Sequence, residues 1–256
     1  GRYGLGSKDT TPQSIFAVYE NLASDKPKNG FTIGIVDDVT GHSLPEHTAP
    51  DTAAPGTISC KFWGLGGDGA NKNSIKIIGD HTDKYVQAYF QYDSKKTGGV
   101  TISHLRFGDQ PIKAPYYITK ANFVACHNVA YLHKGFKIVD DVKPGGTFLL
   151  DCQWSADQLG EMLPASVKSY IAKNNVNFYI INATSIARND IGNMKVKNTI
   201  LQSAFFALAN IMPKDDAITY MKEKATKSYS KFGDEVVAQN HKAIELGAGA
   251  LVHVDV

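Results

Sequence analysis

Residues 57–79 read TISCKFWGLGGDGANKNSIKIIG, and this stretch decides the fold of the chain. Residues 57–63 are rich in β-branched and aromatic side chains, which predicts a strand. The next six residues, GLGGDG, hold four glycines and predict a tight turn. Ile75 and Ile78 lie three positions apart in the segment that follows, which predicts a helix over residues 70–79. A strand joined by a short turn to a helix is a building unit of α/β sheets.

The chain after this stretch continues to alternate between strand and helix patterns. Strands are predicted at residues 85–92, 100–107, 122–126, 148–151 and 177–181. Helices are predicted from residue 197, from residue 213 and over residues 233–246, because apolar side chains recur there at helical spacing. Such alternation favours a parallel sheet that is covered on both faces. We therefore predict a three-layer α/β/α fold with a mostly parallel sheet and a helical C-terminal region.

The first 56 residues have a different character. Pro12 predicts the start of a short helix that ends near Leu22, and residues 31–36 alternate like a strand. Residues 41–56 contain three prolines, two glycines and few apolar side chains, which is typical of an exposed loop. We predict an inter-domain junction over residues 1–56 and one domain over residues 57–256.

The composition argues against several classes of protein. The formal net charge is +2, so the chain as a whole has no field that attracts a nucleic acid or an anionic membrane. No apolar run is long enough to span a bilayer, and residues 1–4 begin no signal peptide. The cysteines, Cys60, Cys126 and Cys152, are far apart, whereas an iron–sulfur cluster needs closely spaced thiolates. We expect buried, reduced cysteines in a cytoplasmic protein.

The glycine-rich turn is the strongest candidate for a binding site. Glycines let backbone N–H groups approach a ligand, and the following helix directs its positive dipole end toward the turn. A phosphate group suits both features, and a side-chain donor and a positive charge in the first helical turn add to them. The candidate binding residues are Gly64, Gly66, Gly67, Asp68, Gly69, Asn71 and Lys72. The alternative is that the glycines serve the turn alone.

Three known motifs can be compared with this turn. A Walker A loop is absent, because the glycines are not followed by Gly-Lys-Ser/Thr. Glycines 64, 66 and 69 match the spacing of a dinucleotide-binding fingerprint, so an NAD(P)-binding domain stays open, although Asp83 lies at a turn and not at a strand end. Residues 67–69 (GDG) match half of a thiamine diphosphate motif, but the Asn-Asn pair at residues 174–175 is too distant to complete it.

A second polar cluster follows the strand at residues 85–92. It reads YDSKKTGG over residues 92–99, and its candidate phosphate contacts are Ser94, Lys95 and Lys96. Ligands of open α/β sheets gather at the carboxyl ends of strands, which favours this position. The alternative is a solvated hairpin turn with surface lysines.

A third cluster, Cys126-His127-Asn128, ends the strand predicted at residues 122–126. Adjacent strand residues point to opposite faces, so Cys126 and His127 are not expected to form a nucleophile–base pair. Asn128 is a candidate ligand contact or the cap of a following helix. The remaining histidines have no metal-ligand spacing, and we predict no catalytic residue and no metal site in this chain.

Taken together, several strings resemble one family. They are KFWGLGGDG at residues 61–69, YDSKKTGG at 92–99, ISHLRFG at 102–108, FVACHN at 123–128 and NTILQSAFF at 198–206. In this order they resemble the gamma-type domain of pyruvate:ferredoxin (or flavodoxin) oxidoreductases. Residues 1–8, GRYGLGSK, are similar to the junction that precedes this domain, so the resemblance covers nearly the whole chain.

The resemblance implies a function. Such enzymes decarboxylate pyruvate on thiamine diphosphate, pass electrons through iron–sulfur clusters to ferredoxin or flavodoxin, and transfer the acetyl group to coenzyme A. The gamma-type domain is associated with coenzyme A, whose phosphates the glycine-rich turn and the lysine pair would contact. Thiamine diphosphate, Mg²⁺ and the clusters would be held by other domains of a homo-oligomeric enzyme, and the isolated domain would be inactive. The alternatives are an NAD(P)-binding domain and an assembly module without a ligand.

The chain departs from the family pattern at one place. Family members have a few more residues between Gly-Asp-Gly and Ala-Asn-Lys, whereas here Gly69 is followed directly by Ala70. A shorter loop would offer a phosphate fewer backbone donors, so this position bears directly on the coenzyme A assignment.

Overall fold

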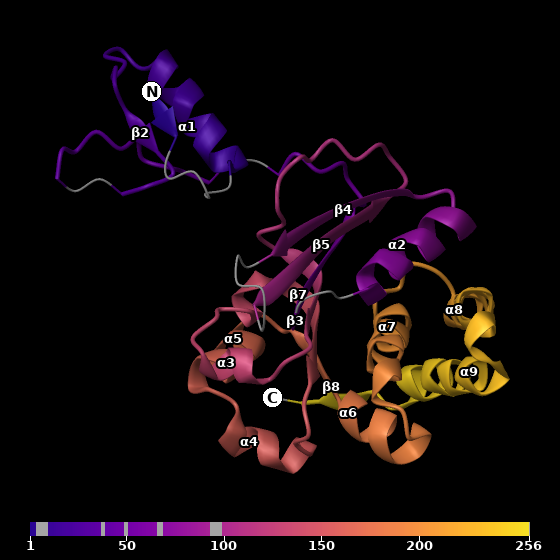
Figure 1. Cartoon of the computed structure of the whole chain (residues 1–256). Helices are drawn as coiled ribbons and strands as arrows, with labels where there is room; N and C mark the ends of the chain where they lie inside the picture. The colour runs from indigo at the N-terminus through magenta and orange to yellow at the C-terminus, as the bar shows by residue number, and fades with distance from the viewer. Residues whose placement is uncertain (4–9, 37–38, 49–50, 66–68, 93–98, 256) are drawn as a thin grey trace. The chain divides into compact units, whose positions relative to one another are not determined.

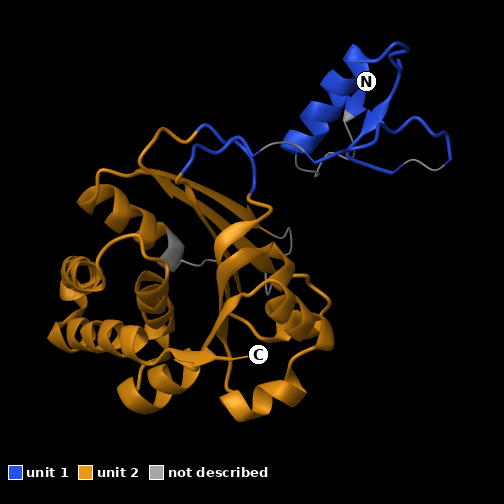
Figure 2. Ribbon diagram, turned by 180° about the vertical axis from the view of Figure 1, so that it is seen from behind, with its two compact units in different colours: residues 1–55, 113–117 blue, residues 56–112, 118–256 orange. Residues whose placement is uncertain are grey.

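A seven-stranded mixed sheet lies at the centre of the larger part of the computed structural model (Figure 1). The structure describes residues 1–3, 10–36, 39–48, 51–65, 69–92 and 99–255. The chain divides into two compact units, unit 1 with residues 1–55 and 113–117, and unit 2 with residues 56–112 and 118–256 (Figure 2). The boundary predicted at residue 56 separates functional domains. The division into compact units does not test it, so it stays a prediction.

The sheet of unit 2 has parallel strands in its middle and antiparallel strands at both edges. Its spatial order is β4 (Tyr85–Tyr92), β5 (Val100–Gly108), β3 (Ile58–Leu65), β6 (Ala121–Cys126), β7 (Val142–Asp151), β8 (Asn177–Ile181) and β9 (Val252–Val254). Strands β3, β6, β7 and β8 are parallel to their neighbours in this series, whereas β5 is antiparallel to both β3 and β4, and β9 to β8. The carboxyl ends of β3, β4, β6, β7 and β8 therefore lie at one edge of the sheet.

Helices cover both faces of this sheet (Figure 1). One face carries α2 (Gly69–His81), α7 (Lys197–Leu208), α8 (Lys214–Tyr229) and α9 (Asp234–Gly249), and the other carries α3 (Ala130–His133), α4 (Leu159–Met162) and α5 (Ala165–Lys173). Alternating side chains of the strands feed the two cores: Phe62 packs edge-on against Phe205 of α7 at 5.0 Å, and the adjacent Trp63 belongs to the opposite core. The α/β/α class is confirmed.

Shorter elements connect these layers. They are α6 (Ala183–Ser185), a π-helical segment (Ile186–Ile191), and 3₁₀ turns at Val139–Asp141, Ala156–Gln158, Met194–Val196 and Ser230–Phe232. Helices α7 and α9 approach each other at the level of their backbones. A Cβ atom built on Gly247 of α9 would lie 2.4 Å from the carbonyl oxygen of Ile200, so only glycine fits there.

Unit 1 is small and has its own core. It contains β1 (Arg2–Tyr3), α1 (Pro12–Ala23) and β2 (Thr32–Ile33), and β1 pairs with β2 in parallel. Thr11 caps α1 by accepting the Ser14 N–H at 3.2 Å, and Pro12 occupies the first turn as predicted. Ala17, Ile33 and Leu44 form the buried core.

The sequence predicted most strands and the long helices, and three differences stand out. The strand expected at residues 31–36 is reduced to Thr32–Ile33, which pair with Arg2–Tyr3 among the described residues. Strand β9 and the helices α4 to α6 were not anticipated, and α3 was anticipated only as the helix that Asn128 could cap. Residues 113–117, between β5 and β6, belong with unit 1, and no pattern in the sequence indicated this. Among the described residues, no helix combines the length and apolar character that crossing a membrane requires.

Candidate functional site

The two segments predicted to bind phosphate, the glycine-rich turn and the segment with the lysine pair, both leave the sheet at its carboxyl edge. Leu65 at the end of β3 pairs with Val100 at the start of β5, and Tyr92 at the end of β4 pairs with Thr101. The glycine-rich turn leaves the sheet after Leu65, and the segment with the lysine pair lies between Tyr92 and Val100. Both segments therefore begin at the same corner of the sheet, where ligands of open α/β sheets are found.

Several of the predicted contacts lie outside the described residues. They are Gly66, Gly67 and Asp68 of the turn, and Ser94, Lys95 and Lys96 of the second cluster. Their roles stay predictions. Gly69 and Asn71 belong to the first turn of α2, which begins at Gly69, so three residues separate the end of β3 from this helix.

Lys72 lies at this corner in a defined position. It is an exposed residue near the start of α2, and its Nζ lies 5.5 Å from the ring centre of Phe90 on β4. An exposed cation–π contact of this kind is worth about 0.5–1 kcal/mol and orients the ammonium toward the carboxyl end of β4. Among the described residues, no carboxylate forms an ion pair with Lys72.

Two hydrogen bonds from residues that follow β6 hold the backbone at the end of β3. The buried Tyr131 of α3 donates its hydroxyl to the Gly64 carbonyl at 3.1 Å, and the His127 N–H donates to the Trp63 carbonyl at 2.8 Å. Burial raises the pKa of the Tyr131 phenol, so it remains a donor at neutral pH. These two bonds hold the backbone from which the glycine-rich turn starts. Tyr131 is a residue that sequence reasoning missed.

Asn128 serves the local turn. Its Oδ1 accepts the Ala130 N–H at 3.1 Å in a turn that precedes α3, whereas the N-cap of α3 is Val129, which makes no side-chain capping bond. Its side chain is half-buried at the carboxyl edge, and its role as a ligand contact stays a prediction.

The cysteines are buried and unsuited to nucleophilic chemistry. Cys60, Cys126 and Cys152 are free thiols inside the cores, as expected. Burial raises the pKa of the Cys126 thiol to about 12 and also raises the pKa of Cys60 and Cys152. Cys126 lies in the core with Trp63, whereas the His127 ring contacts Phe62 at 6.0 Å in the other core. The expected separation of Cys126 and His127 onto opposite faces is confirmed.

A buried ion pair lies further along the same edge. Asp151 at the end of β7 accepts the Ala183 N–H at 3.0 Å and pairs with Nζ of Lys197 at 2.6 Å. Asp151 is 5% exposed, and Lys197 is the first residue of α7. The pair therefore ties α6 and α7 to the carboxyl end of β7. Sequence reasoning did not single out either residue, although an aspartate that ends an apolar strand is a visible signal.

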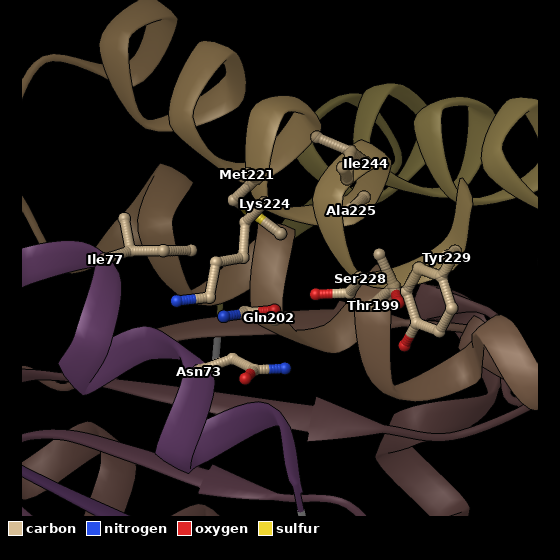
Figure 3. A pocket seen from close by; sticks show the side chains of 10 residues that line it. All are labelled: Asn73, Ile77, Thr199, Gln202, Met221, Lys224, Ala225, Ser228, Tyr229 and Ile244. Atoms are coloured by element: carbon tan, nitrogen blue, oxygen red, sulfur yellow. The ribbon is translucent and has the colours of Figure 1, made fainter. Parts of the chain in front are cut away.

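A small polar pocket lies between α2 and the helices α7, α8 and α9 (Figure 3). Asn73, Gln202, Lys224 and Ser228 contribute polar groups to it, and its volume is about 30 Å³. That volume holds roughly two water molecules. The pocket is therefore too small for a nucleotide.

The topology argues against the two other motif interpretations. Asp83 precedes β4, and residues 174–175 precede β8, so both lie at the amino edge of the sheet. The glycine-rich turn follows β3 at the carboxyl edge. Asp83 therefore does not take the place of the ribose-binding acid of a dinucleotide fold, which follows the second strand. Asn174 and Asn175 end α5 and do not complete a thiamine diphosphate motif with residues 67–69.

Comparison with known proteins identifies relatives. The family model described as "Pyruvate ferredoxin/flavodoxin oxidoreductase" matches residues 59–250. A pyruvate-flavodoxin oxidoreductase from Enterobacter agglomerans is 50% identical over 260 residues, which cover 100% of this chain and 22% of the relative. The chain thus spans about a fifth of that relative's length.

Two solved structures have a similar fold. A pyruvate oxidoreductase subunit from Thermotoga maritima matches with a TM-score of 0.58 and 20% identity, over 78% of this chain and 99% of its own. A 2-oxoglutarate:ferredoxin oxidoreductase from Magnetococcus marinus, with 2-oxoglutarate, coenzyme A and succinyl-CoA bound, matches with a TM-score of 0.56 and 20% identity, over 79% of this chain and 32% of its own.

Proposed function

We propose, from the premise that the chain belongs to the pyruvate ferredoxin/flavodoxin oxidoreductase family, that its carboxyl sheet edge binds coenzyme A. The chain would act as a domain of a longer enzyme that oxidatively decarboxylates pyruvate to acetyl-CoA. In this proposal residues 57–256 are the gamma-type domain and residues 1–56 the junction that precedes it. The coenzyme A named with the Magnetococcus marinus structure, whose fold is similar, supports this choice of ligand.

The observation that carries the proposal is the convergence of phosphate-binding features at one corner. The register Leu65–Val100 joins the glycine-rich turn to the segment that contains Lys95 and Lys96. Helix α2 begins at Gly69 and directs its N–H groups toward the same place. Lys72 adds a positive charge above Phe90. Coenzyme A carries a pyrophosphate and a 3′-phosphate, so its anionic end needs this combination of amides and lysines.

The part of this chain in the reaction is to hold the acyl acceptor. Backbone N–H groups would bind the pyrophosphate, and the lysines would neutralise its charge, which leaves the thiol end free to reach the acyl donor. Fixing one end of a flexible molecule raises the effective concentration of the other end at the reacting group. No side chain of the described residues is assigned a bond-making step.

The redox cofactors of the family do not fit this chain. An iron–sulfur cluster is bound by a set of typically four clustered, ionised thiolates, whereas Cys60 lies in one core and Cys126 and Cys152 lie in the other, all with raised pKa values. The carboxamides at residues 174–175 lie at the wrong edge for thiamine diphosphate and Mg²⁺. We therefore assign these groups, and the contact with ferredoxin or flavodoxin, to other domains of a cytoplasmic, homo-oligomeric enzyme.

Calorimetric titration of the 256-residue chain with coenzyme A tests the proposal. Saturable heat is expected for coenzyme A and none for NAD or NADP. Lys72→Ala is expected to weaken binding about tenfold and to reduce its salt dependence, because one phosphate contact is lost. Lys76→Ala removes an exposed lysine one turn further along α2 and should leave the affinity unchanged. Absence of heat with coenzyme A, or equal losses for both variants, would contradict the assignment.

A second titration separates the two phosphate groups of the ligand. Dephospho-coenzyme A lacks the 3′-phosphate and keeps the pyrophosphate. If the lysine pair contacts the 3′-phosphate, the double variant Lys95→Ala/Lys96→Ala should weaken binding of coenzyme A but leave binding of dephospho-coenzyme A nearly unchanged. Equal weakening for both ligands would instead place the pair on the pyrophosphate, and no weakening for either would remove it from the site.

A further inference from the structure

Tyr131 joins two parts of the carboxyl edge that are far apart in the sequence. It is 1% exposed, and its ring packs edge-on against that of Phe136 with 5.6 Å between the centroids. Its hydroxyl donates to the Gly64 carbonyl oxygen at 3.1 Å. A phenylalanine ring would fill the same space, so packing alone does not require the hydroxyl. A buried hydroxyl must be hydrogen-bonded, so this phenol fixes one position for the end of β3.

Asn128 lies beside this bond, at the end of the neighbouring strand. Trp63 of β3 pairs with Cys126 of β6 in parallel, so Leu65 and Asn128 each follow that pair by two residues. Neighbouring strands are about 4.8 Å apart, which brings Asn128 close to the point where the glycine-rich turn starts. The side chain of Asn128 is also hydrogen-bonded to the Tyr131 phenol.

The direction of these hydrogen bonds follows from the chemistry of the groups. The Gly64 carbonyl only accepts, so the single hydroxyl proton of Tyr131 is used there. The phenol oxygen must then accept from Asn128, which presents its Nδ2 amide group. The other end of the carboxamide is held separately, because Oδ1 accepts the Ala130 N–H at 3.1 Å. One chain of hydrogen bonds therefore runs from Asn128 through Tyr131 to Gly64.

The electrostatics of the phenol agree with this direction. Burial raises the pKa of Tyr131, and the hydrogen bond from Asn128 lowers it, as a donated N–H should. A carboxamide nitrogen carries two N–H groups, so Asn128 can hold the phenol with one and donate the other to a ligand. Asn128 is half-buried at the carboxyl edge, where a further N–H donor suits phosphate oxygens.

We propose that Tyr131 is a positioning residue for coenzyme A, because it orients the Asn128 carboxamide and the start of the glycine-rich turn together. The inference rests on the proposed function, since it takes coenzyme A as the ligand of this edge. Tyr131 is itself buried and acts through its two partners. Loss of its hydroxyl therefore weakens ligand binding while the packing of the ring is kept.

Calorimetric titration with coenzyme A compares Tyr131→Phe with a matched variant. Tyr170 also donates its hydroxyl to a strand-end carbonyl, that of Val142 at 2.7 Å, but at the amino edge of the sheet. Both variants lose such a bond, so urea denaturation should show a similar loss of stability for each. Tyr131→Phe should weaken coenzyme A binding about tenfold, because two groups of the site lose their orientation, whereas Tyr170→Phe should bind like the wild type.

A double-mutant cycle tests whether Tyr131 acts through Asn128. Asn128→Ala removes the carboxamide, so Tyr131→Phe then has less left to disorder. The combined variant should lose less affinity than the product of the two single losses. A combined loss equal to that product would mean two independent effects and would contradict the chain of hydrogen bonds.

The carboxamide signal of Asn128 provides a readout without ligand. In ¹⁵N–¹H spectra of the 256-residue chain, the Nδ2 proton bonded to Tyr131 should move upfield in Tyr131→Phe and keep its position in Tyr170→Phe. An unchanged signal in Tyr131→Phe would overturn the positioning role. No heat with the wild-type chain would overturn the proposed ligand, and with it the role of Tyr131 toward that ligand. Equal affinities of the wild type and Tyr131→Phe for coenzyme A would overturn the role of Tyr131 alone.

Discussion

Lowering the pH from 7 to 5 should destabilise unit 2 through a single buried histidine, His104 on β5. This side chain is 2% exposed, and its pKa is lowered to about 3. Burial is the main cause, and the positive charges of Lys61 and Arg106 add to it. Both cations are held in place, Lys61 by Asp141 at 2.8 Å and Arg106 by Gln87 at 2.8 Å.

The magnitude follows from the difference in proton binding between the folded and unfolded states. Nδ1 of His104 accepts the Ile118 N–H at 3.1 Å, so the folded imidazole is neutral with its proton on Nε2. The unfolded chain protonates this histidine near pH 6.5, whereas the folded chain does so near pH 3. Stability is therefore complete above pH 6.5 and is lost progressively as the pH falls toward 3. At pH 5 the loss is about 2 kcal/mol.

Urea denaturation followed by tryptophan fluorescence measures the free energy of unfolding of unit 2, which contains His104. Trp63 and Trp154 are the two tryptophans of the chain, and both lie in unit 2. The variant His104→Asn keeps an acceptor for the Ile118 N–H but cannot take up a proton. Other groups titrate equally in both proteins, so the difference between them isolates His104.

The wild-type chain should lose about 2 kcal/mol more than His104→Asn between pH 7 and pH 5. His133→Asn removes an exposed histidine and should behave like the wild type. If the wild type and His104→Asn lost the same free energy of unfolding, the burial argument for His104 would be refuted.

Two further substitutions test the packing and the edge of the sheet. Gly247→Ala places a Cβ atom against the Ile200 carbonyl and should lower the free energy of unfolding by about 2–3 kcal/mol. The control Gly249→Ala, whose Cβ atom would have no heavy atom within 4 Å, should leave the free energy of unfolding equal or raise it. Equal melting temperatures for the two variants would contradict the close approach of α7 and α9. Asp151→Ala leaves Lys197 and the buried Ala183 N–H without their partner and should lower the free energy of unfolding by about 1–3 kcal/mol in urea denaturation, because the partly exposed Lys197 can turn to solvent. Asp151→Asn keeps an acceptor for that N–H and should lose less, and an equal loss would show that the ion pair alone matters.

Much of the fold could be predicted because strong local patterns agree with the tertiary structure. Residues 198–206 place apolar side chains at helical spacing, and α7 buries that face against the sheet. β4 was predicted with its actual bounds, because alternation and turn residues mark both of its ends. β9 was missed, since its three residues, VHV, are too few for a pattern and depend on pairing with β8.

The failures at residues 31–36 and at the site have a common physical reason. FTIGIV has strand propensity, but a strand forms only where it pairs with a partner, and among the described residues β1 pairs with Thr32 and Ile33 alone. At the site, the glycine-rich turn could be found from local spacing. Tyr131 could not, because its bond to Gly64 joins residues 67 positions apart. The local sequence determines the backbone conformation, whereas the partners that a side chain finds across the sheet depend on the complete topology.

The location of bound coenzyme A tests the central claim most directly. Backbone amide shifts of the ¹⁵N-labelled 256-residue chain can be followed by nuclear magnetic resonance during a titration with coenzyme A. Binding at the carboxyl edge predicts the largest shift changes at residues 64–72 and 92–101, with smaller changes near residues 127–131. Residues 143–146 and 174–177, at the amino edge of the sheet, should remain unchanged. Changes confined to the amino edge, or none at saturating coenzyme A, would contradict the account.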